Sequence, residues 1–492
     1  MPSNLSIRTL TLAAGAALAL IPAASAHGAV LTRCNDLPTL VSARCGTIVV
    51  PLDRAAPQLG TTTVAYAFVP RRLRSKPSLG TIVYNPGGPG DAPIASAPLV
   101  VAGMRPLLAR RDLLLVDPRG SGRSDRLRCP ALEDPAFAFA SHRRTVAAIG
   151  ACGRSLGPRA GAYSTVAVAD DIEAVRAALG RERLDLWGES YGTYLMTVFA
   201  ARHPQHVQSI LLSGAYPLAF DPWGRDRLAA ARRALRGVCA LTHRCNGRRA
   251  LADLATVAAR LRREPLNTHA VVGTRRVTVR IDEAALAGLL YADGDPERLV
   301  PLPAALAAAH AGDLAPLRRL AVRARMGLAQ QMADPAAARS YSPAQSWATQ
   351  CADYPRAYSY LDPPGVRRDA YVAARDALDP RTFAPFSAAG WTQAGFEAVD
   401  WCLGWPGKVD ATLPSSPDPR PPRVPVLVLS GALDANTPVR AGRQAAAQFP
   451  AATFLTVAEA GHTPTRSQCG VRLALRFVAT HQANPRACAP RR

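Results

Sequence analysis

Residues 184–200 read Leu-Asp-Leu-Trp-Gly-Glu-Ser-Tyr-Gly-Thr-Tyr-Leu-Met-Thr-Val-Phe-Ala. An alternating apolar run is followed by Gly-x-Ser-x-Gly and then by a stretch with few helix breakers, so this sequence predicts a strand, a sharp turn and a helix. Glycine suits positions 188 and 192 because the turn strains the backbone of Ser190 and leaves no room for neighbouring side chains. The pattern predicts a nucleophile elbow, although Gly-x-Ser-x-Gly by itself also occurs in ordinary turns. At an elbow, the free N–H of Tyr191 would point toward an oxyanion.

A second glycine-rich loop follows the short apolar strand expected at residues 81–84. The loop reads Asn85-Pro86-Gly87-Gly88-Pro89-Gly90. Its prolines stiffen the backbone and remove the N–H groups at 86 and 89, which leaves Gly87 and Gly88 as the donors near the tip. We expect Gly88 to act with Tyr191 as an oxyanion donor. A tight loop without a chemical role is the alternative.

Two later strands are each followed by a residue that could complete a catalytic triad with Ser190. Asp434 follows the strand expected at residues 424–429, and His462 follows the strand expected at residues 452–457. The chain order Ser, Asp, His is the order found in an α/β-hydrolase. We therefore expect Ser190 as the nucleophile, His462 as the base and Asp434 as the acid.

Each of these assignments has an alternative. Asp434 could merely cap the turn before Pro438, and Glu459 competes with it for the role of the acid, although Glu459 lies before the histidine loop. His462 is one of nine histidines. Its flanking glycine and its place after the last strand favour it over the others.

The alternation of strands and helices around these motifs predicts a mostly parallel sheet wrapped by helices, as in an α/β-hydrolase core. Residues 217–422 interrupt this pattern with alanine-rich and arginine-rich helical periodicity, so we expect a large, mainly helical cap insertion there. The first residues predict a signal peptide over 1–26, because an arginine precedes an apolar run that is short for a membrane span and ends at Ala-Ser-Ala. The expected parts of the core are then residues 27–216 and 423–492.

Composition sets the expected partners and compartment. The formal charge is +23, but nearly all the basic residues are arginines scattered among alanine and proline, so we expect no nucleic-acid partner and no stable membrane insertion. Ten cysteines in a chain expected to be exported predict disulfides, and without a Cys-x-x-C pattern we expect no metal or other cofactor. Pairing of neighbours predicts Cys34–Cys45, Cys129–Cys152, Cys239–Cys245, Cys351–Cys402 and Cys469–Cys488.

Five motifs together resemble those of the secreted tripeptidyl aminopeptidases and their prolyl-aminopeptidase-like relatives. They are the loop at 85–90, Asp-Pro-Arg-Gly-Ser-Gly-Arg-Ser at 117–124, Gly-Glu-Ser-Tyr-Gly-Thr-Tyr-Leu at 188–195, Gly-Ala-Leu-Asp-Ala-Asn-Thr-Pro at 431–438 and Gly-His-Thr at 461–463. The resemblance implies a secreted serine exopeptidase that acts on peptides near their free N-termini, with a helical cap that measures the substrate. It also implies catalytic roles for Ser190, Asp434 and His462, and oxyanion roles for Gly88 and Tyr191.

An enzyme of this kind must accommodate a protonated α-amine, and two acidic residues are candidates for that role. Glu189 lies beside the nucleophile, and Asp353 lies in a Cys-x-Asp segment that resembles part of the family's cap. An ordinary ion pair with an arginine is the alternative for either.

Asn85 with Glu189 also resembles the serine carboxypeptidases, in which such a pair binds a C-terminal carboxylate. An esterase or lactonase, or a non-catalytic exported binding protein, are further alternatives.

Overall fold

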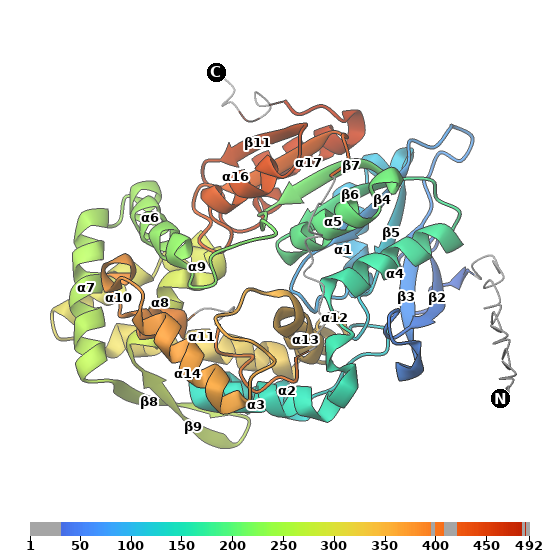
Figure 1. The fold of residues 1–492 in the computed structure, drawn as a ribbon. Helices are drawn as coiled ribbons and strands as arrows, with labels where there is room; N and C mark the ends of the chain where they lie inside the picture. The colour runs from blue at the N-terminus through green and yellow to red at the C-terminus, as the bar shows by residue number, and fades with distance from the viewer. Residues whose placement is uncertain (1–30, 395–398, 408–420, 485–487, 489–492) are drawn as a thin grey trace, which may run out of the picture.

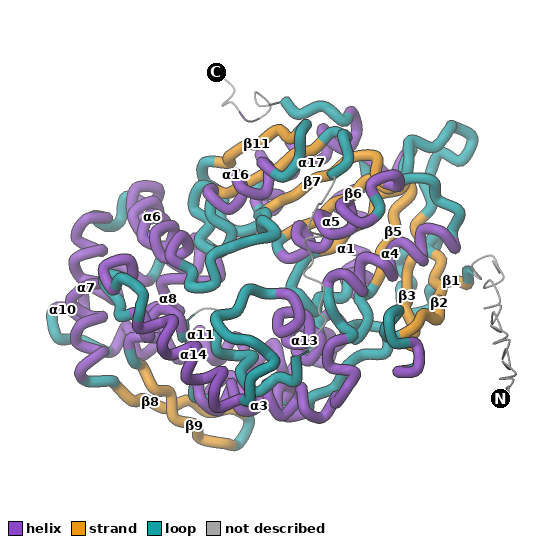
Figure 2. Tube along the Cα trace, in the orientation of Figure 1, coloured by secondary structure: helices purple, strands orange, loops and turns teal. Residues whose placement is uncertain are grey.

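The fold is built around one nine-stranded sheet, drawn as arrows in Figure 1 and in orange in Figure 2. The computed structural model describes residues 31–394, 399–407, 421–484 and 488, so the expected signal peptide lies outside the described residues. In sheet order, the strands are β1 (Thr32–Arg33), β2 (Arg44–Pro51), β3 (Thr61–Val69), β5 (Asp112–Val116), β4 (Thr81–Asn85), β6 (Leu184–Glu189), β7 (Val207–Ser213), β10 (Val426–Gly431) and β11 (Ala452–Val457). β1 to β3 and β5 pair antiparallel in turn, whereas the six strands from β5 to β11 are parallel.

The parallel strands are buried because helices cover both faces of the sheet. One face packs against α4 (Thr165–Ala178), α5 (Tyr191–Arg202) and α16 (Val439–Ala447), and the other against α1 (Ala97–Met104) and α17 (Gln468–Thr480). In β5, Leu114 belongs to the first of these apolar clusters, while Leu113 and Leu115 belong to the second. Successive side chains of a strand point to opposite faces, so an uninterrupted run of leucines serves both layers.

A largely helical layer is inserted between β7 and β10 and lies beside the sheet, at the left and lower centre of Figure 1. It has its own apolar core. Its elements are α6 (Arg225–Thr242), α7 (Gly247–Arg263), β8 (Leu266–Val272), β9 (Arg275–Ile281), α8 (Glu283–Tyr291), η7 (Ala292–Gly294), α9 (Pro296–Leu299), α10 (Leu302–His310), α11 (Ala315–Ala333), α12 (Pro335–Ser340), α13 (Pro343–Asp353), α14 (Pro364–Asp376) and α15 (Ala388–Thr392). The predicted fold class, a mostly parallel sheet with a large helical cap, is therefore confirmed. Among the described residues, no helix has both the length and the apolar character needed to cross a bilayer.

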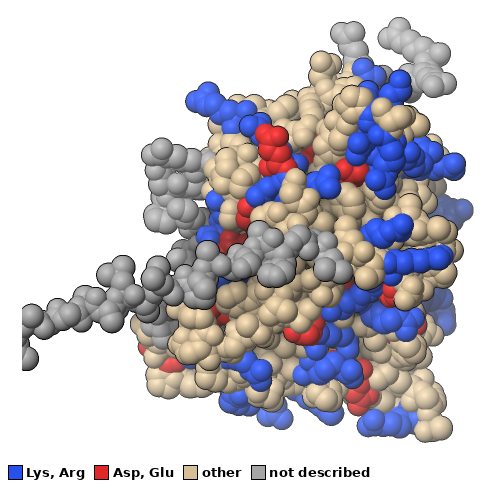
Figure 3. Space-filling model, turned by 90° about the vertical axis from the view of Figure 1, so that its right-hand side faces the viewer, with Lys and Arg blue, Asp and Glu red and all other residues tan. Residues whose placement is uncertain are grey.

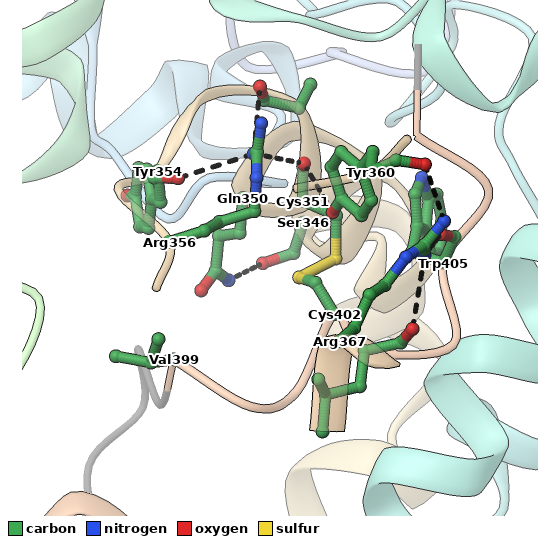
Figure 4. Close-up of a disulfide and its surroundings, with 12 residues drawn as sticks. Ser346, Gln350, Cys351, Tyr354, Arg356, Tyr360, Arg367, Val399, Cys402 and Trp405 are labelled. Carbon is green, nitrogen blue, oxygen red and sulfur yellow. Dashed lines mark hydrogen bonds between the residues drawn. A yellow bond between two sulfur atoms is a disulfide. The ribbon is translucent and has the colours of Figure 1, made fainter. Parts of the chain in front are cut away.

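All five predicted cysteine pairs are disulfides in the structure. The pair that closes the longest loop, Cys351–Cys402, joins α13 to the segment beyond α15 (Figure 4). Two arginines surround this bond. Arg356 donates to the backbone oxygen of Cys351 at 2.9 Å, and Arg367 donates to the backbone oxygen of Trp405 at 2.8 Å. Arg356 thus satisfies a carbonyl in the last turn of α13, and Arg367 satisfies one in the segment beyond α15, on the other side of the disulfide.

The arginine-rich surface carries both signs of charge. On the face drawn in Figure 3, Lys and Arg side chains occur in several separate groups with Asp and Glu side chains among them. Several of the exposed arginines pair with acidic neighbours, as Arg440 does with Asp226 at 3.0 Å. On this face, the positive charge is thus dispersed between acidic and uncharged surface.

Candidate active site

Ser190 lies at the sharp turn between β6 and α5. Its φ of 53° and ψ of −129° are strained values for a residue with a side chain. A Cβ atom at Gly188 would overlap the carbonyl of Gly192, and one at Gly192 would overlap the carbonyl of Asn85. Glycine is therefore required on both sides of the serine, as the sequence pattern predicts.

Three residues from separate strand ends lie in series at this turn. His462 Nε2 lies 2.7 Å from the Ser190 hydroxyl oxygen, and His462 Nδ1 lies 3.1 Å from Asp434 Oδ2. Ser190 follows β6, Asp434 follows β10 and His462 follows β11. The structure thus brings together the three residues that the sequence predicts as a triad. Both distances are within hydrogen-bond range for a nucleophile, a base and the group that orients the base.

The carboxylate of Asp434 is buried and accepts three further hydrogen bonds. Its Oδ1 accepts from the backbone N–H groups of Asn436 and Thr437 at 2.7 and 2.8 Å, and its Oδ2 accepts from the Thr437 hydroxyl at 2.6 Å. These donors offset the cost of burying the carboxylate. Asp434 therefore both caps the turn before Pro438 and faces His462. Glu459, the competing acid, is exposed.

The loop at residues 85–90 packs directly against the elbow. A Cβ atom at Gly87 would lie 2.9 Å from Ser190 Cβ and 3.1 Å from Tyr191 N. The N–H of Gly87 donates to Asn85 Oδ1 at 3.0 Å, and Pro89 has no N–H. Gly88 is therefore the residue of this tip whose N–H is not taken up within the loop. The N–H of Tyr191 belongs to the first turn of α5, where it has no partner inside the helix.

Asn85 and Glu189 do not form a pair. β4 and β6 run parallel with Asn85 opposite Gly188, so the side chains of Asn85 and Glu189 leave the sheet on opposite faces. The Glu189 carboxylate is buried and accepts from the Thr465 hydroxyl at 2.6 Å and from the Trp187 indole at 3.3 Å. A substrate-binding role for Asn85 or Glu189 stays a prediction, and their observed contacts shape the loop and the base of the elbow.

Asp353, the last residue of α13, is buried against the N-terminus of α4. Its Oδ2 accepts from the backbone N–H and the hydroxyl of Thr165 at 2.6 and 2.5 Å. The Thr165 hydroxyl also lies 2.8 Å from the Tyr191 hydroxyl. Burial raises the pKa of Asp353 to about 6, although the hydrogen bonds from Thr165 lower it. Its contacts give Asp353 a structural position behind the elbow helix, and its predicted role in binding substrate remains a prediction.

The structure shows contacts around His462 that the sequence did not indicate, one of them from the cap. The backbone N–H of His462 donates to the carbonyl of Gly294 at 2.8 Å. Asn436 Nδ2 lies 3.2 Å from His462 Nε2, while Asn436 Oδ1 accepts from the hydroxyls of Tyr291 and Tyr216 at 2.5 and 3.0 Å. Asn436 could have been suspected from its place two residues after Asp434. Gly294 and Tyr291 carry no such signal, because they lie about 170 residues from His462, and only folding brings Gly294 to His462 and Tyr291 to Asn436.

Comparisons with known proteins agree with this geometry. A family model described as alpha/beta hydrolase fold matches residues 80–238, and one described as TAP-like protein matches residues 387–488. The serine protease Hip1 of Mycobacterium tuberculosis is 33% identical over 196 residues, which cover 37% of this chain and 37% of the relative. The tripeptidyl aminopeptidase of Streptomyces lividans is 29% identical over 186 residues, 34% of each chain. The putative hydrolase YuaR of Escherichia coli is 28% identical over 183 residues, which cover 35% of this chain and 36% of the relative.

The aligned regions therefore span little more than a third of the length of these curated relatives. They nevertheless confirm the resemblance that the sequence motifs predict, since one family model covers the elbow and the other covers Asp434 and His462. The sheet topology and these matches together show an α/β-hydrolase fold, and the C-terminal part of the chain is similar to the family described as TAP-like protein.

Proposed function

We propose that this protein is a serine exopeptidase that hydrolyses peptide bonds near a free N-terminus. The observation that carries the proposal is the continuous series from Ser190 Oγ through His462 to Asp434, with contacts of 2.7 and 3.1 Å. The names of the relatives, a serine protease and a tripeptidyl aminopeptidase, support a peptidase over other hydrolases on this fold.

In the proposed mechanism, His462 Nε2 takes the hydroxyl proton of Ser190 while Oγ attacks the carbonyl carbon of the scissile bond. Asp434 holds the ring in the tautomer with hydrogen on Nδ1 and stabilises the imidazolium that forms. The N–H groups of Gly88 and Tyr191 donate to the oxyanion, and loss of one such donor costs about 3–4 kcal/mol of transition-state stabilisation. His462 then gives its proton to the leaving amine, and water, activated by the same ring, releases the acyl group from Ser190.

We also propose that the enzyme works outside the cytoplasm on peptide substrates. Five disulfides support this location, because such bonds persist in oxidising compartments and are rare in the cytosol. The N-terminal sequence, with its apolar run and Ala-Ser-Ala, points to the same compartment.

A panel of matched peptides tests the activity. It contains peptides of four to eight residues with free, N-acetylated or C-amidated ends, together with a simple ester, and the products are identified by mass spectrometry. We expect cleavage that releases one to three residues from free N-termini and that acetylation suppresses. Cleavage that C-amidation blocks would instead indicate a carboxypeptidase, and turnover of the ester alone would indicate an esterase.

A further inference from the structure

Asp91 is a carboxylate beside the oxyanion loop that none of the contacts described so far uses. It follows Gly90 directly, and its Cγ lies 3.5 Å from the position that a Cβ atom would take on Gly88. The side chain is half-buried. Among the described residues, the Asp91 carboxylate accepts no hydrogen bond and forms no ion pair.

The cap holds Asp91 in this position. Ala92 N–H donates to the carbonyl of Ser340 at 2.7 Å, and Ser342 N–H donates to the carbonyl of Gly90 at 3.0 Å. Asp91 and Tyr341 are therefore directly opposite each other in an antiparallel bridge, between two hydrogen bonds made by their neighbours. Side chains of such a pair project to the same face and lie close together. A carboxylate and an aromatic ring thus lie side by side next to the tip of the oxyanion loop, and both attract a cation.

In the part of the chain that the structure describes, the charged and titratable groups around Asp91 form no ion pair with it. Burial raises the pKa of Asp91 to about 6, and the charge of Arg466 lowers it. Arg466 is exposed and lies beyond ion-pair distance. Tyr84 and Tyr341 also face this carboxylate, and burial raises the pKa of both phenols, so they stay neutral. A carboxylate that is partly removed from water and lacks a hydrogen-bond donor is stabilised by a cation that binds close to it.

We propose that Asp91, beside Tyr341, binds the α-ammonium group of the substrate. This inference rests on the proposed function and names the subsite that would select a free N-terminus. Because one residue of extended chain spans at most about 3.6 Å, a carboxylate beside Gly88 suits an ammonium group one or two residues from the scissile carbonyl. Glu189 and Asp353 are less suited to this role, because each carboxylate already accepts hydrogen bonds from the protein: Thr465 donates to Glu189 Oε1, and Thr165 donates twice to Asp353 Oδ2.

Binding measurements on the full chain carrying Ser190→Ala, in which turnover is removed, test the subsite directly. The probes are alaninamide, dialaninamide and trialaninamide with their N-acetylated counterparts, titrated by calorimetry. We expect Asp91→Asn to weaken the binding of the free amines about 10- to 100-fold relative to the acetylated probes, most strongly for the probe with the shortest acyl part. Asp91→Glu, which keeps the charge, should restore part of this preference. Free-amine binding should also weaken below pH 6, as Asp91 becomes protonated.

Arg466→Gln is the matched control. It removes the nearby positive charge, so the preference for free amines should increase. The subsite is refuted if Asp91→Asn leaves the preference unchanged, or if both variants lower it together with the melting temperature, which would make Asp91 and Arg466 a structural pair. If the unaltered enzyme cleaves peptides with free N-termini and Asp91→Asn does not change the preference for free amines, the subsite alone is overturned. Binding that depends on Asp91 without peptide cleavage would overturn the proposed function alone.

Discussion

At the scale of single residues, Ser190 and His462 are 272 positions apart in the chain, and their side chains lie 2.7 Å apart because each follows the end of a parallel strand. Carboxyl ends of parallel strands meet at one edge of the sheet, so turns that follow different strands place their side chains together there. Rigid strands hold such groups more precisely than mobile loops would. The reacting groups of the proposed mechanism therefore depend on the sheet for their geometry.

Ser190→Ala should lower kcat by about 10⁴-fold or more, because it removes the nucleophile from a group of residues that act as a unit. The folded state should keep its melting temperature, since Ser190 makes no side-chain cap to α5. Ser141→Ala is the matched control. Its hydroxyl accepts from the N–H of Arg144 at the start of α3 (His142–Leu156), so its loss should cost about 1 kcal/mol of stability and leave kcat unchanged. Substantial turnover by Ser190→Ala would contradict the triad.

At the scale of elements, the short turn η7 reaches His462 from the cap. Gly294 accepts from His462 N–H, and its φ of 72° favours glycine. A Cβ atom here would lie 2.8 Å from Asp434 Oδ1 and 3.0 Å from His462 Cβ. The cap therefore fits against the triad with no space for a methyl group between them.

Gly294→Ala should consequently displace His462 or Asp434 and lower kcat on the order of 100-fold, as a shift of about 1 Å does in other enzymes. Gly273→Ala is the control, because Gly273 has a φ of 59° in the β8–β9 turn but nothing within 4 Å of its Cβ position. Both variants should lose about 1–2 kcal/mol of stability to backbone strain. Steady-state kinetics measures the displacement of the triad, and thermal unfolding measures the backbone strain. An equal kcat in both variants would argue against a tight contact of Gly294 with His462 and Asp434.

The contact between α13 and α4 carries a pH dependence of stability. The pKa of Asp353 is raised by burial to about 6 in the folded protein, and in the unfolded chain it returns to its ordinary value near 4. Between these pH values, the folded state binds more protons than the unfolded state, so stability falls as pH rises from about 4 to about 6. A shift of this size corresponds to at most about 3 kcal/mol.

Asp353→Asn should reduce this fall, because its amide oxygen can accept both Thr165 hydrogen bonds without carrying a charge. Asp353→Ala should instead destabilise the protein at both ends of the range, since it removes the acceptor for the Thr165 N–H. Thermal unfolding at pH 4.5 and pH 7.5 measures, for each variant, how much stability is lost between these two pH values. If the unaltered protein and Asp353→Asn lose the same stability between pH 4.5 and pH 7.5, the Asp353 carboxyl group titrates normally.

At the scale of the whole molecule, disulfides limit how far the unfolded chain can expand. The Cys351–Cys402 bond closes a loop of 51 residues, and the Cys239–Cys245 bond closes a loop of 6 residues. Loop-closure entropy predicts that the first bond stabilises the fold by about 4 kcal/mol and the second by about 2 kcal/mol. The longer loop contains α14 and α15, so this bond secures a large part of the cap.

Cys351→Ser with Cys402→Ser should therefore lower the free energy of unfolding by roughly twice as much as Cys239→Ser with Cys245→Ser. Denaturant titrations of both double variants measure this ratio. Kinetics on a chromogenic amide should show the loss of activity following unfolding of the cap. A larger loss of stability from the shorter loop would show that local packing, and not loop closure, dominates.

Local patterns in the sequence were enough to predict the elbow, the fold class and all five disulfide pairs. The elbow and the strands depend on glycine placement and hydrophobic periodicity over a few residues, and each cysteine pairs with a neighbour along the chain. The order of Ser190, Asp434 and His462 also follows from the succession of strands, because the topology of an α/β sheet brings their ends to one edge.

Only the tertiary structure decided how the cap and the acidic residues relate to this edge. The sequence suggested Glu189 and Asp353 and did not single out Asp91. Whether a carboxylate already accepts hydrogen bonds depends on donors such as Thr165 and Thr465, which lie 188 and 276 residues from their acceptors. The contact of Gly294 with His462 likewise joins distant segments. Such contacts depend on how whole layers pack, and no pattern within a few residues encodes that packing.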